Sequence, residues 1–431
     1  MVKMYWWLMD EKIVEPTEDR CPLTLLLLSL VLLATPLAAQ GRDCDGYLTP
    51  LVVPAGFCVR PFAEKVGPVR HLVVHPTGVV IAATKLPPGL VSLADTSGDG
   101  QADVVTRFGP GEGGTGVAWR AGWLYFAADI GIYRIPWPAT SRAPTGVGEW
   151  IVERLPAGGS GWAHYMKGIV AAADGALYVS IGSSSDNCQA GGAEGAIRIP
   201  GQWPCPELTT RAGIWRFVPP ATGKAAWVGS RYATGLRNAM AMAQDHATGT
   251  LWALTHGRDF LNRTWGVSDE ESADQPAELL VRVVAGADFG WPYCMGRWRF
   301  NAPTTLVVAP DYASQAGAAC ATKTQPTVGF PGHWAPMAVA LATEAMPEGW
   351  RRGLLIAFHG SRSRSPLPEA GHQLLYQPLD AGGMPAGESR ILLRSSDRPG
   401  TLRLAGVAVA ANGMVYLADD DFGRIIRIEK R

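Results

Sequence analysis

The sequence predicts an all-β protein, a six-bladed β-propeller, and three observations support this prediction. The 431 residues include 51 Gly, 33 Pro and 16 Trp, a composition typical of tight turns and aromatic-bearing strands. Apolar residues make up 47% of the chain and charged residues 18%, which is enough apolar material for a large core. Finally, one hairpin pattern recurs six times along the chain.

Each copy of the pattern is an apolar strand, a tight Gly-containing turn and a second apolar strand rich in β-branched and aromatic residues. The copies are LVVHPTGVVIAAT from Leu72, GVAWRAGWLYFAAD from Gly116, GIVAAADGALYVSIG from Gly168, MAMAQDHATGTLWALTHG from Met240, AVALATEAMPEGWRRGLLIAFHG from Ala338 and GVAVAANGMVYLADD from Gly406. Because one hairpin cannot bury its face alone, the repeats indicate blades that pack on their neighbours. We expect one propeller domain over residues 41–431; a two-domain sandwich is the alternative.

Residues 1–40 are interpreted as a signal peptide with an atypical n-region. The apolar run from Leu23 to Leu33 is too short to span a bilayer and is followed by the small-residue segment ATPLAAQ, so we expect cleavage near Ala39. The residues before Leu23 carry mixed charges, which suit an export signal poorly. The alternative is an uncleaved signal that anchors the chain to a membrane. Cleavage would make the protein periplasmic or secreted.

The cysteine count supports export. Apart from Cys21 the chain has an even six cysteines, which form three sequence-local pairs. We expect the pairings Cys44–Cys58, Cys188–Cys205 and Cys294–Cys320. Such bridges form in oxidising compartments, and the alternative is six buried free thiols.

The charge balance argues against a nucleic-acid partner. Lys and Arg number 38, as do Asp and Glu, so the formal net charge is zero and nothing attracts a phosphate backbone. One acidic loop stands apart. Asp95, Asp99 and Asp103 occupy its positions 1, 5 and 9, and Gly100 occupies position 6. A calcium loop would use such carboxylates, but the terminal bidentate Glu is missing. We therefore expect a solvated acidic turn between blades.

Several polar residues directly precede the repeated hairpins. They are His164, Arg237, Asn238, His333 and Arg403. In a propeller these strand ends converge around the central channel, so side chains far apart in sequence can face one ligand. The alternative is that each of them only locks a blade through hydrogen bonds. The longest spacers, residues 257–291 and 293–333, carry few periodic runs, and loops of this length on a rigid scaffold are often functional.

Five segments resemble the glucose/sorbosone dehydrogenases, soluble six-bladed propellers that use pyrroloquinoline quinone (PQQ) with calcium. The segments are SGWAHYMKGIVAAADGALYVSIGS, YATGLRNAMAMA, AELLVRVVAGADFGWPYCMG, FHGSRSRSP and LAGVAVAANGMVYLADDDFGRIIRI. The resemblance runs from Leu51 to Ile428 and covers every blade. Its most specific parts are the G-L-R-N and G-x-D-F-G-W-P motifs and the His ten residues before Asp174.

The resemblance assigns His164 as the catalytic base. Oxidation of an alcohol or hemiacetal removes a proton from oxygen and a hydride from carbon, and a neutral imidazole suits the proton. Arg237 matches the arginine beside the quinone oxygen, where a fixed guanidinium stabilises developing negative charge. Asn238 matches a cofactor-contacting amide.

The resemblance also implies a calcium site. The matching ligands are the backbone carbonyls of Gly257 and Arg258. Glu278, with the carbonyl of Phe289, is expected to serve a further, structural calcium. Arg258 departs from the family, since many soluble glucose dehydrogenases have Pro at that position.

Binding of the PQQ carboxylates requires cations, and Arg364, Arg403 and Lys167 match positions that suit this role. Two departures concern the sugar site: Ala163 replaces an Asp, and the glutamine of the soluble glucose enzymes is missing near Gly113–Gly116. The expected substrate is therefore left as a sugar, a sugar aldehyde or a polyol, with electrons passed to a periplasmic acceptor such as a cytochrome or quinone.

Two other functions remain open for this scaffold. A calcium-dependent hydrolase of the lactonase type needs carboxylates and amides that converge on a metal, whereas the polar residues singled out here are mostly basic. A non-catalytic binding propeller is the second alternative. The arginines favour an anionic cofactor.

Overall fold

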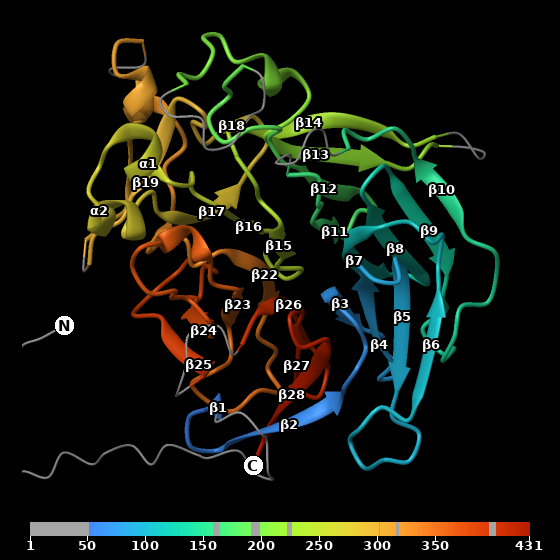
Figure 1. The fold of residues 1–431 in the computed structure, drawn as a ribbon. Helices are drawn as coiled ribbons and strands as arrows, with labels where there is room; N and C mark the ends of the chain where they lie inside the picture. The colour runs from blue at the N-terminus through green and yellow to red at the C-terminus, as the bar shows by residue number, and fades with distance from the viewer. Residues whose placement is uncertain are drawn as a thin grey trace, which may run out of the picture. The chain divides into compact units, whose positions relative to one another are not determined.

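The computed structural model describes residues 51–157, 164–190, 199–221, 226–300, 302–315, 319–395 and 402–431. Within these residues the strands form six sheets of four or five strands and one two-stranded sheet. In Figure 1 the first strand of each large sheet lies near the middle of the molecule and the last strand lies at the rim. The predicted six-bladed β-propeller is confirmed.

The first three blades follow one another along the chain. Blade 1 contains β3 (Val69–Val74), β4 (Val80–Thr84), β5 (Gly89–Ala94) and β6 (Val104–Phe108). Blade 2 contains β7 (Gly114–Arg120), β8 (Trp123–Ala128), β9 (Ile132–Pro136) and β10 (Glu149–Val152). Blade 3 contains β11 (Ile169–Ala171), β12 (Leu177–Ile181), β13 (Gly213–Val218), β14 (Val228–Thr234) and, parallel to β14, β18 (Ala287–Asp288).

The other three blades include strands from distant parts of the chain. Blade 4 contains β15 (Ala241–Gln244), β16 (Leu251–Thr255), β17 (Glu278–Val283) and β21 (Val328–Phe330). Blade 5 contains β22 (Pro336–Leu341), β23 (Gly353–Phe358), β24 (Gln373–Pro378), β25 (Arg390–Ser395) and β1 (Leu51–Val52). Blade 6 contains β26 (Leu404–Val409), β27 (Val415–Asp419), β28 (Arg424–Lys430) and β2 (Phe57–Ala63).

Shorter elements occupy the loops, and all of them except η1 and η4 lie in the long spacers 257–291 and 293–333 that the sequence singled out. They are α1 (Leu261–Trp265), α2 (Asp269–Asp274), η1 (Pro206–Thr209), η2 (Pro310–Tyr312), η3 (Ala319–Thr322), η4 (Arg362–Arg364) and the hairpin of β19 (Cys294–Arg297) with β20 (Thr305–Val308). In the described ranges, no helix is both long and apolar enough to cross a membrane.

Each repeated hairpin of the sequence forms the two inner strands of one blade. The second strand of the pair has no hydrophobic alternation because blades cover both of its faces; β4, β12 and β16, for example, are buried along their whole lengths. The outermost strands lie at the rim, and β6 is exposed over most of its length. The inner strands are buried and therefore continuously apolar, which explains why the repeated sequence pattern contains them and not the outer strands.

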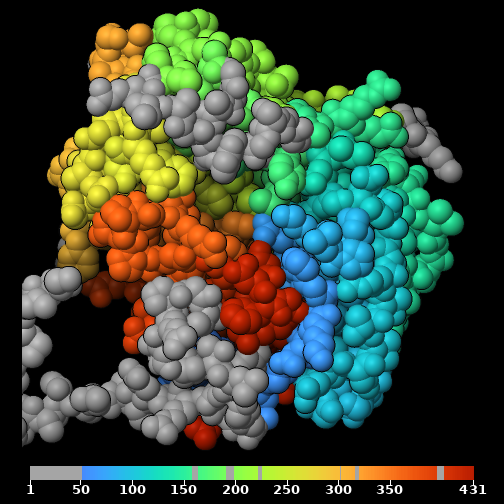
Figure 2. All heavy atoms as spheres, viewed as in Figure 1, coloured from blue at the N-terminus to red at the C-terminus, as the bar shows by residue number. Residues whose placement is uncertain are grey.

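The ring is closed by residues from both ends of the described chain. Strand β2 is the outer strand of blade 6, where Val59 pairs with Ile428. Strand β1 adds to blade 5, where Leu51 pairs with Ser395. Figure 2 shows the first described residues (blue) beside the C-terminal residues (red). Sequence-distant strands therefore complete these two blades.

Antiparallel pairing within each hairpin brings the start of the first strand and the end of the second strand to the same end of the blade. Gly114 at the start of β7 pairs with Ala128 at the end of β8, and Leu404 at the start of β26 pairs with Asp419 at the end of β27. The segments before each first strand and after each second strand therefore meet at one end of the propeller, which we call the site end.

Two of the expected disulfides are confirmed, Cys188–Cys205 and Cys294–Cys320. Cys58 is also disulfide-bonded, whereas Cys44 lies outside the described residues. The predicted signal peptide and its cleavage point also lie outside them.

The acidic turn of residues 95–103 joins β5 to β6 within blade 1, not two blades to each other as the sequence suggested. Its carboxylates are used inside the turn. Asp95 accepts from the backbone amides of Gly98 and Gly100, and Asp103 accepts from Thr96. These bonds account for the acidic residues without an ion.

Candidate functional site

His164 lies at the site end, in the segment that leads into β11. Its Nδ1 is 3.1 Å from the carbonyl oxygen of Ser183, so Nδ1 carries the hydrogen and the Nε2 lone pair faces away from that carbonyl. Among the described residues, none bonds to Nε2. Burial and then the positive charge of Arg237 hold the pKa of His164 well below its ordinary value. The imidazole is therefore neutral and can accept a proton at Nε2.

Arg237 is buried in the segment before β15 and its guanidinium has three partners. It donates to the carbonyl of Gly257 at 2.7 Å, and it pairs with Asp259 at 2.8 Å and with Asp186 at 2.8 Å. Two carboxylates and a carbonyl hold a planar guanidinium in one orientation. Arg237 is thus a fixed positive charge beside His164.

Arg258 extends this charge network to the long spacers. Its guanidinium is 3.2 Å from Asp186 and 2.6 Å from the fully buried carboxylate of Asp311. Asp311 also accepts from Asn187 at 2.7 Å and from the backbone amide of Gly201 at 3.1 Å. The Arg258 side chain that departs from the family therefore ties loops of blades 3 and 4 together, and its burial is offset by paired carboxylates.

His333 joins the same network. Its Nδ1 is 3.4 Å from Asp259 and its Nε2 is 2.8 Å from the carbonyl oxygen of Ser272. Burial opposes ionisation, but the hydrogen bond and charge of Asp259 outweigh it and raise the pKa of His333. Both ring nitrogens face acceptors, which favours the protonated form, so His333 orients Asp259 and lacks the free lone pair that a base needs.

Asn238 contacts a second histidine of the site end. Its amide nitrogen is 3.0 Å from Nδ1 of His256, whose Nε2 donates to the carbonyl of Pro336 at 3.0 Å. Burial lowers the pKa of His256 to about 4. This neutral histidine fixes the rotation of the Asn238 amide.

The predicted calcium ligands lie together around the start of the loop after β16. The carbonyl of Gly257 accepts from Arg237, as above. The Glu278 carboxylate accepts from the backbone amides of Gly257 at 3.1 Å and Ala335 at 3.2 Å, and burial raises its pKa to about 7. Both Glu278 oxygens are therefore engaged by the backbone.

The three predicted carboxylate-binding cations differ in their surroundings. Lys167 is buried and donates to the carbonyls of Asp129 at 2.6 Å and Tyr165 at 2.7 Å, and burial lowers its pKa to about 8. Arg364 pairs with Asp274 at 2.9 Å, at the contact of η4 with α2. Arg403 is described with its partners below.

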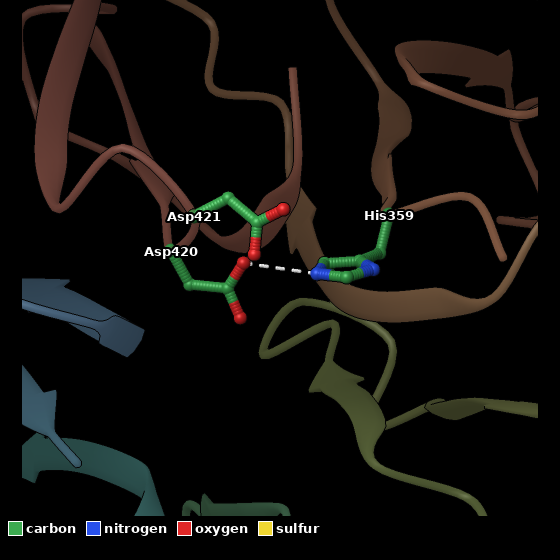
Figure 3. A group of neighbouring side chains, drawn as sticks. All are labelled: His359, Asp420 and Asp421. Atoms are coloured by element: carbon green, nitrogen blue, oxygen red, sulfur yellow. Dashed lines mark hydrogen bonds and ion pairs between the residues drawn. The ribbon is translucent and has the colours of Figure 1, made fainter. Parts of the chain in front are cut away.

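Arg403 belongs to a second charged group, around His359, Asp420 and Asp421. Figure 3 shows His359 directed at Asp420, with 2.9 Å between Nε2 and the carboxylate. Within the described chain these three side chains are the one group spaced as metal ligands are. Asp420 is paired with Arg70 and Asp421 with Arg403 at 3.1 Å, so guanidinium groups already neutralise both carboxylates.

Sequence reasoning missed the residues that follow the second strand of each hairpin. Reasoning from the residues considered the segments before the first strand, and the family resemblance added only Gly257, Arg258 and Arg364 after a second strand. Antiparallel pairing brings both kinds of segment to one end of the blade. The signal was the charged residues that directly follow second strands, in S-S-S-D-N, H-G-R-D and A-D-D-D. The residues missed are Asp129, Asp186, Asp259, His359 and Asp420, together with Arg70 and Asp311.

The comparisons with known proteins identify the family and the fold of the chain. The TrAA12-like family model matches residues 51–431. The chain belongs to the TrAA12-like family. None of the curated proteins searched matches it significantly.

Solved structures similar to this TrAA12-like protein share its fold. The Trichoderma reesei family AA12 carbohydrate-active enzyme has a TM-score of 0.73 at 17% identity over 90% of this chain and 100% of that one. The pyranose dehydrogenase PQQ domain of Coprinopsis cinerea has a TM-score of 0.71 at 16% identity, over 90% and 98% of the two chains. The PQQ-bound aldose sugar dehydrogenase of Streptomyces coelicolor has a TM-score of 0.52 at 15% identity, over 88% and 100%. The departure at Ala163 lies outside the described residues.

Proposed function

We propose that this TrAA12-like protein is a PQQ- and calcium-dependent oxidoreductase that oxidises a sugar, sugar aldehyde or polyol. The observation that carries the proposal is the tautomer of His164. Its Nδ1–H donates to Ser183, which leaves Nε2 as a base at the site end. The family and the PQQ-bound neighbours support the cofactor.

The chemistry of the donor set fits an anionic quinone. Lys167, Arg237 and Arg403 directly precede the first strands of three different blades, β11, β15 and β26, and all lie at the site end. PQQ carries three carboxylates, so it needs several such donors. We assign its binding to Arg237, Asn238, Lys167, Arg364 and Arg403.

The protein residues have distinct tasks in this reaction. Bound PQQ would supply the hydride acceptor. His164 takes the hydroxyl proton of the substrate at Nε2, because its lowered pKa keeps it unprotonated. Arg237, held by Asp186 and Asp259, places positive charge where the acceptor becomes negative, without reorganisation of its surroundings.

Calcium is assigned to the carbonyls of Gly257 and Arg258, since it prefers oxygen ligands. The Gly257 carbonyl accepts from Arg237 at 2.7 Å, so it would bind the ion through its second lone pair. Glu278 fits less directly, because its two oxygens accept from backbone amides and would have to exchange those bonds.

We also propose that the protein works outside the cytoplasm, as a periplasmic or secreted enzyme, and passes electrons to a cytochrome or quinone there. Cys188–Cys205 and Cys294–Cys320 support an oxidising compartment.

The test uses purified chain without cofactor. PQQ should bind tightly only with calcium, EDTA should release it, and the loaded protein should reduce a dye with at least one sugar or polyol. Arg364→Ala should weaken PQQ binding by about 2 kcal/mol if its charge pair is largely desolvated. Arg352→Ala is the control, because Arg352 forms an exposed ion pair with Glu344. Absence of PQQ binding, or binding that chelation leaves unchanged, contradicts the proposal.

The hydrolase alternative gains no support from the described side chains. A lactonase-type metal would need free carboxylates, whereas Asp420 and Asp421 are paired with Arg70 and Arg403. A binding propeller without catalysis would give no dye reduction in the same assay.

A further inference from the structure

A small polar cavity lies at the site end where blades 1, 2 and 3 meet. Its volume is about 40 Å³, and its walls are contributed by the start of β7, the ends of β4 and β8 and the segment that leads into β11. The side chains that matter are Thr115, Asp129, Tyr165, Arg70 and Lys85. A cavity needs about 10–15 Å³ to hold one water, so this one has room for a small polar fragment such as a hydroxymethyl group.

Three polar atoms of the cavity side chains are shielded from solvent and have no hydrogen-bond partner in the described part of the chain. They are Thr115 Oγ1, Asp129 Oδ1 and Arg70 Nε. Thr115 is 1% exposed and Arg70 is 8% exposed. Since buried polar groups are normally hydrogen-bonded, two oxygens and one N–H in the same place indicate a site for a partner that both donates and accepts.

The geometry around Asp129 keeps this space open. A Cβ atom at Gly113 would lie 3.1 Å from Asp129 Oδ2, so a larger residue there would crowd the carboxylate. The backbone carbonyl of Asp129 is taken by Lys167, which leaves the carboxylate itself available. Arg70 Nη2 donates to the thioether sulfur of Met166 at 2.7 Å. A thioether is a weak acceptor, and a hydroxyl oxygen would be a stronger one.

The charges of the cavity favour a neutral ligand. Arg70 is already paired with Asp420, and the remaining Lys85 and Asp129 carry opposite charges, so the cavity has no net charge to attract an anionic or an ammonium group. A hydroxyl group suits both, because it donates to Asp129 and accepts from a cation. Tyr165 and Met166 directly follow His164, which connects the cavity to the proposed base.

We propose that this cavity is the substrate subsite that binds a hydroxyl or hydroxymethyl group of a neutral sugar or polyol, with Asp129 and Thr115 as its specificity-determining residues. The proposal rests on the proposed function. It places in this cavity the end of the substrate that is not oxidised. Asp129 would supply an acidic contact for the substrate, although Ala163 replaces the family's acidic residue.

The test compares three isosteric variants loaded with PQQ and calcium: Asp129→Asn, Thr115→Val and, as control, Asp174→Asn. Asp174 lies at the opposite end of blade 3, in the turn between β11 and β12, where it pairs with Arg216. For the sugar that the wild type oxidises best, KM should rise about 10- to 100-fold in Asp129→Asn. The kcat should change little, because the lost contact stabilises the ground state and the transition state equally. The control should match the wild type.

Monodeoxy analogues of the same sugar sharpen the test. At one ring position, loss of the hydroxyl should raise KM of the wild type but raise it no further in Asp129→Asn, since the shared interaction is already gone. Equal deoxy effects in both proteins, or an unchanged KM in both Asp129→Asn and Thr115→Val, overturn the subsite. If one variant fails to fold by circular dichroism, the other decides. A wild type that oxidises no sugar or polyol overturns the proposed function, and the subsite with it.

Discussion

At the scale of single residues, the site end is organised by the protonation states of its histidines. His164 and His256 are neutral, whereas His333 has acceptors at both nitrogens. Only His164 combines a fixed Nδ1–H with an Nε2 that no described residue engages. His333 would have been the next base to consider from the sequence, but its contacts with Asp259 and Ser272 give it an orienting role.

Replacement of His164 tests the base. His164→Ala and His164→Gln should lower kcat by about 10²- to 10⁴-fold, the usual contribution of general-base catalysis. PQQ and calcium binding should persist, because the imidazole acts on substrate. Stopped-flow turnover and PQQ titration measure the two effects. Loss of cofactor binding in His164→Gln would instead make His164 a structural residue.

The pH profile gives an independent check on the same residue. The pKa of His164 is lowered, chiefly by burial and next by Arg237, so the base stays unprotonated below the ordinary histidine range. As pH falls, kcat/KM should therefore remain level through about 6.5, the unperturbed value, and decline only in more acidic buffer. In His164→Gln this acidic limb should disappear. A wild-type decline centred on the ordinary value would contradict the buried setting.

Asp186 was not singled out in the sequence, but it forms ion pairs with two buried arginines. It contacts Arg237 at 2.8 Å and Arg258 at 3.2 Å and accepts the backbone amide of Asp259 at 2.9 Å. Asp186→Asn removes its charge and leaves both buried guanidiniums undercompensated, so the free energy of unfolding should fall by about 3–5 kcal/mol.

Urea denaturation measures the effect of Asp186→Asn, and Glu344→Gln is the matched control. Glu344 forms an ion pair in which both side chains are more than two-thirds exposed, at 68% and 69%, so its loss should cost less than about 1 kcal/mol. Similar losses in the two variants would show that the Asp186 network contributes no more than a surface pair.

At the scale of elements, the two disulfides hold the long loops that carry the site network. Cys188 lies two residues after Asp186, and Trp291 donates to the Asp186 carbonyl at 2.9 Å. Tyr312 donates to the Asn187 carbonyl at 2.9 Å, and Tyr293 accepts the amide of Cys205 at 2.8 Å. The spacers that looked irregular in sequence are thus packed against each other.

The two bridges should differ in their effect on activity. Each closes a loop of moderate length, with separations of 17 and 26 residues, so removal of either should cost about 3 kcal/mol of stability. The Cys188→Ala/Cys205→Ala variant should also lower kcat, because it releases the loop that positions Arg237 through Asp186. The Cys294→Ala/Cys320→Ala variant should retain more activity. Equal kcat values in the two double variants would refute this link.

At the scale of the whole molecule, ring closure joins the two ends of the propeller. Strand β2 supplies the outer strand of blade 6, with Val59 and Phe62 buried. Deletion of residues 1–63 should therefore expose the edge of β28 and the core beneath it, and abolish the cooperative thermal transition. A chain that starts at residue 41 should keep the transition of the full-length protein. Calorimetry compares the two, and a cooperative transition in the shorter chain would contradict the closure argument.

The sequence by itself determined the fold class and the position of each inner hairpin. Strands buried between neighbouring blades are apolar without alternation, and this local signal survives in the six repeats. It also placed His164 and Arg237 before first strands and paired the cysteines of two bridges. Outer strands such as β18 and β21 were not predicted, because they pair with partners far away in the chain.

Only the tertiary structure decided which charges meet. Asp186, Asp259 and Asp311 lie up to 125 residues apart, yet their carboxylates converge on Arg237 and Arg258. Their pairing depends on the loops of two blades packing together, which no local pattern encodes. Protonation is decided in the same way, since burial lowers the pKa of His164 whereas Asp259 raises the pKa of His333, although both are histidines before a first strand.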